Sequence, residues 1–448
     1  MIFVATLILL GAIWLSVWAR FRDPFHPLII MLPAAMFIYG ALPLAIYRAD
    51  QARFMFSVGD DFLYTYHALM IALLLALVLG VQRATRGLTR QTMRWQQLDI
   101  DRAARVRFWA LVLGLIGAAA FVYGIWNAGG LAGAYGRAYG GGAARSGYVR
   151  ELRYIGLIGV LLVYVLRVGK GMRAVDWLII LLCILPTVTH GLLGARRGPT
   201  FLAAIVTVGG YVFFMRKRIP LPVIIAAGAG LGLGMLFLVA NRNAIYIGSQ
   251  VDSFRNPLET LERWASNEYL IGSTVVRYAL QEGSFYGLRE LSHLIGRILP
   301  SFVWPTVYTD LPHLLGLDVD IRVNVGMNPA RMAEIVGWTP SVGSAEGFGA
   351  SLWMEFGFLA FPVAYVIGLL YGRVWVAARD NVTARIVYLL MAALSIYLMM
   401  QNFDPWIYRL LLFGGPAWLA ARMIQAAPRS AQPRSPRAAR PPLRPRHP

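Results

Sequence analysis

The sequence is poor in charged residues, and in lysine and cysteine above all. Only 14% of its 448 residues are charged, and 22 are Asp or Glu. Two of the 42 basic residues are lysine, and Cys183 is the single cysteine. One cysteine excludes an intramolecular disulfide and a site made of several thiolates. So little charge beside 58% hydrophobic residues excludes an ordinary soluble domain, because about a quarter of the residues in such a domain are charged.

Long apolar runs account for this composition. A bilayer core about 30 Å thick requires about 20 apolar residues per helix. Runs of this kind lie at 2–19, 27–47, 61–82, 108–126, 151–167, 175–194, 200–215, 219–240, 346–371, 386–401 and 407–424. The sequence therefore predicts an all-α polytopic membrane protein with about eleven transmembrane helices.

The basic residues predict the orientation of these helices. With the N-terminus outside, the short cytoplasmic loops and the tail hold 25 of the 42 basic residues, if Arg167 and Arg422 at the adjoining span ends are included. Short loops determine orientation, and cytoplasmic loops are enriched in Arg and Lys. We therefore expect a periplasmic N-terminus and a cytoplasmic C-terminus. The excess positive charge would face anionic lipid headgroups, and no basic stripe of the kind that binds nucleic acid is found.

The spans divide the chain into four parts. Residues 1–240 hold the first eight predicted helices, and 346–424 hold the last three. Between them, 241–345 form a long, nearly neutral stretch that we call the lid segment; we expect it to be periplasmic and mainly helical. Residues 425–448 alternate Pro and Arg with little that is apolar, so we expect a disordered cytoplasmic tail.

The lid segment carries three helix signals. Asn256-Pro257 and Asn328-Pro329 each place an N-cap before a first-turn proline, and Gly337 would end the second helix. Between them, apolar residues recur at helical spacing over 288–299, which predicts an amphipathic helix along the outer membrane surface. Its polar side aligns Arg289, His293 and Arg297. This side is either a solvated face or a cationic stripe over an anionic lipid-linked substrate.

Two adjacent arginines lie in the short turn before the seventh predicted span. Arg196 and Arg197 run against the positive-inside bias, because this turn is on the predicted outer side. The planar guanidinium suits a diphosphate, since it donates two parallel hydrogen bonds. Arginines that snorkel to lipid headgroups are the alternative. His190 lies two turns inward on the same face as Arg197, and an ionisable residue there is either functional or a hydrogen-bonded core histidine.

The acids offer several further candidates. Asp60-Asp61 opens the third span. This pair is either a base or metal ligand of the kind that a membrane glycosyltransferase would use, or an acid pair that the helix dipole favours. Asp318-Val319-Asp320 has the form of a metal-binding motif of nucleotide-sugar enzymes, but it lies outside the membrane, where nucleotide sugars are absent. Asp404-Pro405 looks like the N-cap and first residue of the last span.

Glu346 and Glu355 lie nine residues apart, on opposite faces of one unbroken helix, which would keep them from lining one site. Glu355 is expected to pair with an Arg of another helix. In the eighth span, Gly228, Gly230, Gly232 and Gly234 are expected to allow close packing against a neighbouring helix.

Three stretches of the region 190–372 resemble a known family. They are Gly194-Ala195-Arg196-Arg197-Gly198, the run from Gly283 through Tyr286-Gly287 to Arg297, Pro300 and Trp304-Pro305, and Gly343-Ser344-Ala345-Glu346 leading into Glu355-Phe356-Gly357 and Gly368. Together they resemble the O-antigen polymerases, which join oligosaccharide repeat units in bacterial envelopes. The doubled arginine departs from the single Arg-Gly of that pattern. The related O-antigen ligases share the general plan.

The resemblance implies a glycosyl transfer without metal or cofactor on the periplasmic face of the bacterial inner membrane. The growing glycan would leave its undecaprenyl diphosphate carrier and join the next lipid-linked repeat unit. Membrane lipids, a chain-length regulator and a flippase would be its partners, and nucleic acid would not. Such a site needs cations for the departing diphosphate, a base near the acceptor hydroxyl and a lid that aligns two substrates.

The candidate residues follow from these needs. The base is sought first at His293 and then at Asp310 and Glu346, with His313 as a further candidate. The predicted diphosphate ligands are Arg196, Arg197, Arg289 and Arg297, and the secondary candidates are His190, Arg242, Arg277, Arg322, Asp60 and Asp61.

Two other classes remain open at this stage. One is a ligase-like enzyme or another membrane glycosyltransferase that uses polyprenyl-phosphate sugars. The other is a non-enzyme, an exporter of polysaccharide or lipid-linked oligosaccharide. An exporter is expected to show internal repeats and charges spread through many spans, and the sequence shows neither.

Overall fold

The computed structural model describes residues 1–48, 59–88, 100–136, 147–215, 219–249, 253–262, 267–299, 303–317, 329–337 and 345–425. All regular structure in these ranges is helical. Nine helices within them are long and apolar enough to cross a membrane. They are α1 (Ile2–Phe21), α2–η1–α3 (Pro27–Arg48), α5 (Asp60–Ala84), α6 (Ile100–Asn127), α10 (Ala174–Leu193), α11–η2–α12 (Arg197–Phe214), α13 (Leu221–Ala240), α19–η6–α20 (Phe348–Ala377) and α21 (Val382–Met400).

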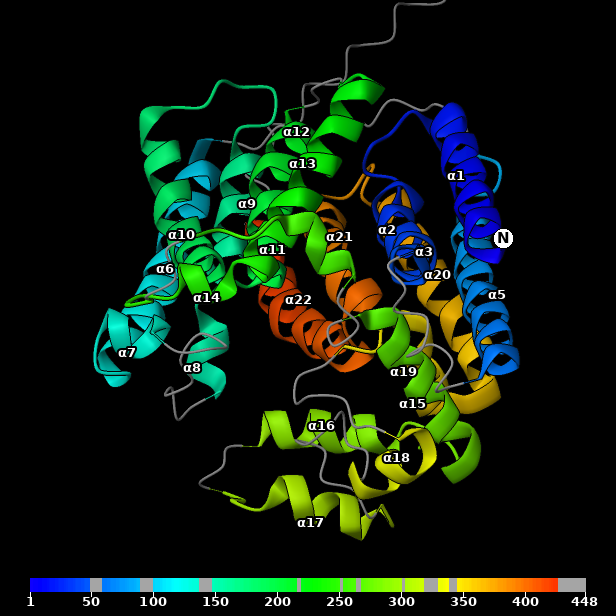
Figure 1. The fold of residues 1–448 in the computed structure, drawn as a ribbon. Helices are drawn as coiled ribbons and strands as arrows, with labels where there is room; N and C mark the ends of the chain where they lie inside the picture. The colour runs from blue at the N-terminus through cyan, green and yellow to red at the C-terminus, as the bar shows by residue number, and fades with distance from the viewer. Residues whose placement is uncertain are drawn as a thin grey trace, which may run out of the picture.

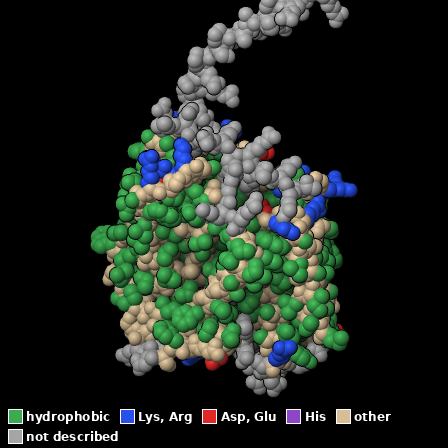
Figure 2. Space-filling model, turned by 90° about the horizontal axis from the view of Figure 1, so that it is seen from above, with side chains coloured by type: hydrophobic (Ala, Val, Ile, Leu, Met, Phe, Trp, Pro, Cys, Tyr) green, Lys and Arg blue, Asp and Glu red, His purple; other side chains and the backbone are tan. Residues whose placement is uncertain are grey.

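The predicted fold class, a polytopic helical membrane protein, is confirmed. Two further predicted spans correspond to α9 (Gly156–Leu166), which is shorter, and to α22 (Phe403–Gln425), which carries Asp404 and Arg409. The count of eleven spans stays a prediction. Seen from the end that lies uppermost in Figure 1, the surface is mainly apolar, with Lys and Arg side chains gathered at a few places (Figure 2).

The lid segment forms α14 (Arg242–Ile245), η3 (Pro257–Glu262), α15 (Glu268–Glu282), α16 (Leu288–Ile298), α17 (Val307–Leu314) and α18 (Pro329–Val336). Of these, α16, α17 and α18 lie at the opposite end of the bundle, and α7 (Leu131–Tyr135) and α8 (Gly147–Leu152) lie toward the same end (Figure 1). We call this end, where α16, α17 and α18 lie beneath the bundle, the lid end. α15 is buried from Glu268 to Ala279 except at Arg277, and it packs on α19.

The helix signals of the lid segment are largely confirmed. α18 begins at Pro329 and ends before Gly337, whose φ is +81°. Asn256 accepts a hydrogen bond from the Leu258 N–H at 3.0 Å, but the element that follows is a 3-10 helix of six residues. Asn328 itself lies outside the described residues, as do Asp318, Asp320 and Arg322.

Glycines behave differently in two helices. A Cβ on Gly368 of α20 would lie 2.0 Å from the carbonyl oxygen of Leu77 in α5, so these two backbones touch. The glycines at 228, 230, 232 and 234 of α13 have no described atom within 4 Å of such a Cβ. The prediction that they pack against a neighbouring helix is therefore wrong within the described chain. A glycine stripe shows that close approach is sterically possible, but not that a partner is present.

Candidate functional site

Helix α16 is amphipathic as predicted, but its polar side is the buried side. Arg289 is 0% exposed and His293 is 8% exposed, whereas Leu291 is 45% and Ile298 is 63% exposed. The interpretation of a solvated polar face is therefore wrong. Periodicity shows that a helix has two faces, and burial of a polar face requires partners that only other helices can supply.

Two backbone hydrogen bonds hold the start of α16 against α19. The Phe285 N–H donates to the Met354 carbonyl and the Gly287 N–H donates to the Glu355 carbonyl, both at 2.9 Å. Gly287 has φ +83°, and a Cβ there would lie 3.1 Å from the Phe356 ring. A glycine is therefore required at this position, both for its backbone conformation and for the close approach.

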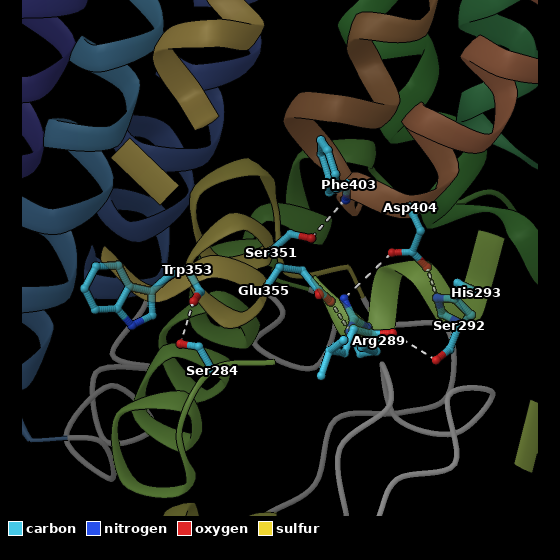
Figure 3. A network of polar contacts seen from close by, with 10 residues as sticks. Ser284, Arg289, Ser292, His293, Ser351, Trp353, Glu355, Phe403 and Asp404 are labelled. Carbon is cyan, nitrogen blue, oxygen red and sulfur yellow. Dashed lines mark hydrogen bonds and ion pairs between the residues drawn. The ribbon is translucent and has the colours of Figure 1, made fainter. Parts of the chain in front are cut away.

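Arg289 is the central cation of the buried polar face. Its Nε donates to Glu355 Oε1 in the last turn of α19, and both side chains are 0% exposed. Its Nη2 lies 3.8 Å from Asp404 Oδ1 on α22 (Figure 3). The predicted ion pair of Glu355 with an arginine of another helix is confirmed.

His293, one turn further along α16, contacts the same aspartate. Its Nδ1 lies 2.6 Å from Asp404 Oδ2 (Figure 3). α22 begins at Phe403, whose N–H donates to Ser351 Oγ at 2.9 Å. Asp404 is therefore inside the first turn, and the prediction that it is the N-cap is wrong. A carboxylate that holds one nitrogen of an imidazole leaves the other for proton transfer.

Two more buried carboxyl groups complete this site. Glu290 is 4% exposed and neither of its side-chain oxygens has a hydrogen-bond donor among the described residues. Burial, and after it the neighbouring Asp404 carboxylate, raises the pKa of Glu290 well above its ordinary value. Burial raises the pKa of Glu346 to about 8, although Arg289 opposes the shift. We call Arg289, Glu290, His293, Glu346, Glu355 and Asp404 the acid–histidine cluster.

Glu346 and Glu355 both act on the Arg289 guanidinium, so the prediction that they cannot share a site is wrong. The prediction assumed one unbroken helix. Instead, α19 begins at Phe348, after Gly347 with φ +78°. The Gly347 N–H donates to the Gln401 carbonyl at 2.8 Å, which brings Glu346 to the end of α21 and beside the start of α22.

A second cluster of opposite charge lies where α7, α8 and the facing ends of α10, α11, α21 and α22 meet. The Arg153 Nη1 lies 2.8 Å from His190 Nδ1, and the Tyr135 hydroxyl lies 3.3 Å from the same nitrogen. Arg409 contacts Glu151 at 3.2 Å and stacks 4.1 Å above the Tyr397 ring. We call Tyr135, Glu151, Arg153, Tyr154, His190, Arg196, Tyr397 and Arg409 the arginine–tyrosine cluster.

The side chains of the adjacent residues Arg196 and Arg197 have different partners. Arg196 acts electrostatically on the phenols of Tyr135, Tyr154 and Tyr397. Arg197, the first residue of α11, pairs instead with Glu268 of α15, whose side chain is 4% exposed. Of the two, Arg196 belongs to the arginine–tyrosine cluster and Arg197 ties α11 to α15.

Helix α22 joins the two clusters. Asp404 and Arg409 are five residues apart, which is about 7.5 Å along a helix axis. Between them, Tyr408 lies under the Arg297 guanidinium, 4.8 Å from it. The acid–histidine cluster and the arginine–tyrosine cluster are therefore neighbouring sites on the first turns of one helix.

The other predicted candidates lie apart from both clusters. Asp310 accepts hydrogen bonds from Thr306 at 2.5 Å and Trp304 at 2.8 Å, which lower its pKa. Both donors come from the residues just before α17, so these bonds are local to the start of that helix. His313 of the same helix is exposed.

The secondary candidates are also scattered. α5 begins at Asp60, and the Asp61 side chain is exposed. Arg242 and Arg277 are partly buried, on α14 and α15.

No protein family, curated protein or solved structure matches this chain. The arrangement of its side chains is therefore the basis for interpreting the site.

Sequence reasoning missed Glu290, Asp404, Arg153 and Arg409 as site residues. One local signal was present. Glu290 and His293 are three residues apart and so project from one face of α16. Asp404, Arg153 and Arg409 lie in segments far from α16 and from the Arg196 turn, and nothing in their own sequence surroundings indicates which residues they meet.

Proposed function

We propose that this protein transfers a glycan from a lipid diphosphate to the sugar of a second lipid-linked unit, and so polymerises oligosaccharide repeat units into a surface polysaccharide. The reaction would take place at the lid end, which we place on the periplasmic face of the bacterial inner membrane. The observation that supports the proposal is the meeting of a cationic cluster and a carboxylate-held histidine on α22.

The arginine–tyrosine cluster has the chemistry that a departing diphosphate needs. Its three arginines face one carboxylate, Glu151, so the cluster carries an excess of positive charge. Guanidinium groups remain charged at any working pH and donate paired hydrogen bonds to phosphate oxygens. Cations already in place stabilise the charge that develops on a leaving group without reorganisation.

The acid–histidine cluster has the chemistry that an acceptor hydroxyl needs. The hydroxyl proton would pass to His293, whose ring is held through Nδ1 by Asp404 at 2.6 Å. The hydroxyl oxygen would then attack the anomeric carbon as the bond from that carbon to the diphosphate oxygen breaks. Arg289 ties α16 to α22 through Asp404 and to α19 through Glu355, which holds His293 and Asp404 at the separation that this contact requires.

The test is elongation by the purified full chain, reconstituted in liposomes, with lipid-linked oligosaccharide extracted from cells that lack this protein. Wild type should give a ladder of polymer on a gel. His293→Gln should lower the elongation rate about 10²–10⁴-fold, the usual contribution of a positioned base.

The matched control is His313→Gln, because His313 is exposed and lies outside both clusters. It should elongate at the wild-type rate. Full activity of His293→Gln would contradict the assigned base. A deletion strain that shows no repeat units on its surface, instead of single ones, would contradict polymerisation and indicate export.

A further inference from the structure

Glu290, His293 and Asp404 bring three metal-ligating side chains together. Glu290 and His293 are three residues apart on α16, and Asp404 comes from the first turn of α22. One ligand atom from each of the three lies within 4.8 Å of the other two. A pair of ligands spaced by three residues on a helix, joined by one from a second helix, is an arrangement that metal sites in helical bundles use.

The charges around this group are not balanced. Four buried carboxyl groups, from Glu290, Glu346, Glu355 and Asp404, act on the buried Arg289 guanidinium. Among the described residues, Arg297 adds a second positive charge that acts on Asp404, so the carboxyl groups still outnumber the arginines. Arg289 forms its direct bond with Glu355, and Glu290 has no donor on either oxygen among the described residues. A buried carboxylate without a counter-charge is costly, so this position requires either a proton or a cation.

We propose that Glu290, His293 and Asp404 form a binding site for a divalent transition-metal ion. One imidazole nitrogen and two carboxylates are a donor set that suits Zn²⁺ or Mn²⁺. Ca²⁺ fits it poorly, because that ion takes six to eight oxygen ligands.

The metal and the proposed base exclude each other. An imidazole whose Nδ1 binds a metal holds its proton on Nε2 and cannot accept another from the acceptor hydroxyl. Metal bound at this site would therefore inhibit the transfer proposed above. This consequence rests on the proposed function, whereas metal binding itself does not.

Metal binding is measured on the full chain in detergent, with any purification tag removed and after treatment with a chelator. Titration with Zn²⁺, followed by calorimetry, should give about one ion per chain. Substituting a metal ligand should weaken metal binding by at least about 100-fold, because mutating even a residue that only hydrogen-bonds to a ligand lowers metal affinity by about 10–100-fold. Glu290→Gln should show this loss. Glu282→Gln should not, because Glu282 is a partly exposed glutamate that pairs with Arg331 outside the site.

Mn²⁺ gives a second readout. Its electron paramagnetic resonance spectrum should show coupling to a nitrogen nucleus in wild type and lose it in His293→Gln. If Glu290→Gln does not fold, the His293→Gln variant provides the test of ligand substitution in its place. Equal Zn²⁺ affinity of wild type and folded Glu290→Gln, or no uptake by folded wild type, would overturn the inference and leave a proton shared by Glu290 and Asp404. Neither result bears on elongation, which is assayed separately.

Discussion

The two clusters on the first turns of α22 differ in charge and in exposure. The acid–histidine cluster buries four carboxyl groups around one guanidinium, and Arg289, Glu346 and Glu355 are all 0% exposed. The arginine–tyrosine cluster has three arginines and one carboxylate, and its Arg153 and Arg196 are only half-buried. Burial raises the pKa of Glu346 to about 8, which is within the working range of pH, whereas a guanidinium stays charged throughout that range. One cluster can therefore exchange protons or cations, and the other can hold an anion at any pH.

The largest effect is expected when the central cation of the acid–histidine cluster is removed. Arg289→Met should lower the free energy of unfolding by about 3–5 kcal/mol, because it leaves Glu355 and Asp404 buried without their partner. Thermal unfolding in detergent measures the loss.

Arg331→Met is the control, since Arg331 is 44% exposed and pairs with Glu282 and Glu334 at the surface. Exposed pairs contribute about 0–1 kcal/mol. A similar loss in both variants would show that the buried charges around Arg289 are compensated in another way.

The second prediction concerns the response to pH. Burial raises the pKa of Glu346 in the folded chain to about 8 from its ordinary value of 4.5. Between these values the unfolded chain loses this proton while the folded chain keeps it, so the contribution of Glu346 to stability falls as pH rises. As the pH rises from 5 to 7.5, the free energy of unfolding of Glu346→Gln should therefore increase by about 3 kcal/mol relative to that of wild type.

The measurement is denaturation of both proteins across that pH range. Glu334→Gln is the matched control, because its side chain is 67% exposed, and its difference from wild type should stay constant with pH. A constant difference for Glu346→Gln as well would mean that Glu346 is ionised in the folded chain.

The smallest expected effect separates the two adjacent arginines. Arg196→Lys should lower the elongation rate about tenfold, or ~1.4 kcal/mol, because an ammonium cannot reproduce the paired hydrogen bonds of a guanidinium to phosphate. Arg197→Lys should retain nearly the wild-type rate, because the lysine ammonium can still form an ion pair with the Glu268 carboxylate. The two rates are compared at equal amounts of folded protein. The opposite order would place the diphosphate beside α15.

Much of the fold follows from local sequence. The apolar runs predict most of the helices, and the Asn-Pro pairs and Gly337 mark the ends of lid helices at the residues where they occur. Helix formation and termination depend on residues a few positions apart, so these features can be inferred from a window of sequence. The ion pair expected for Glu355 follows equally directly, because a carboxylate in an apolar helix requires a counter-charge.

The site itself depended on tertiary structure. The periodicity of 288–299 defined two faces for α16, but it could not show that the polar face is buried. Arg289 finds its partner 66 residues away, and His293 meets Asp404 more than 100 positions later in the chain. Adjacent Arg196 and Arg197 have the same side chain and almost the same sequence surroundings, yet one joins the arginine–tyrosine cluster and the other pairs with Glu268. Hydrophobicity and capping are local properties, so the amino-acid sequence is enough to identify a helical membrane protein and to locate the ends of many of its helices. Which charged groups meet depends on the packing of separate helices, because the free energy of a buried ion pair depends on the partners that this packing brings together.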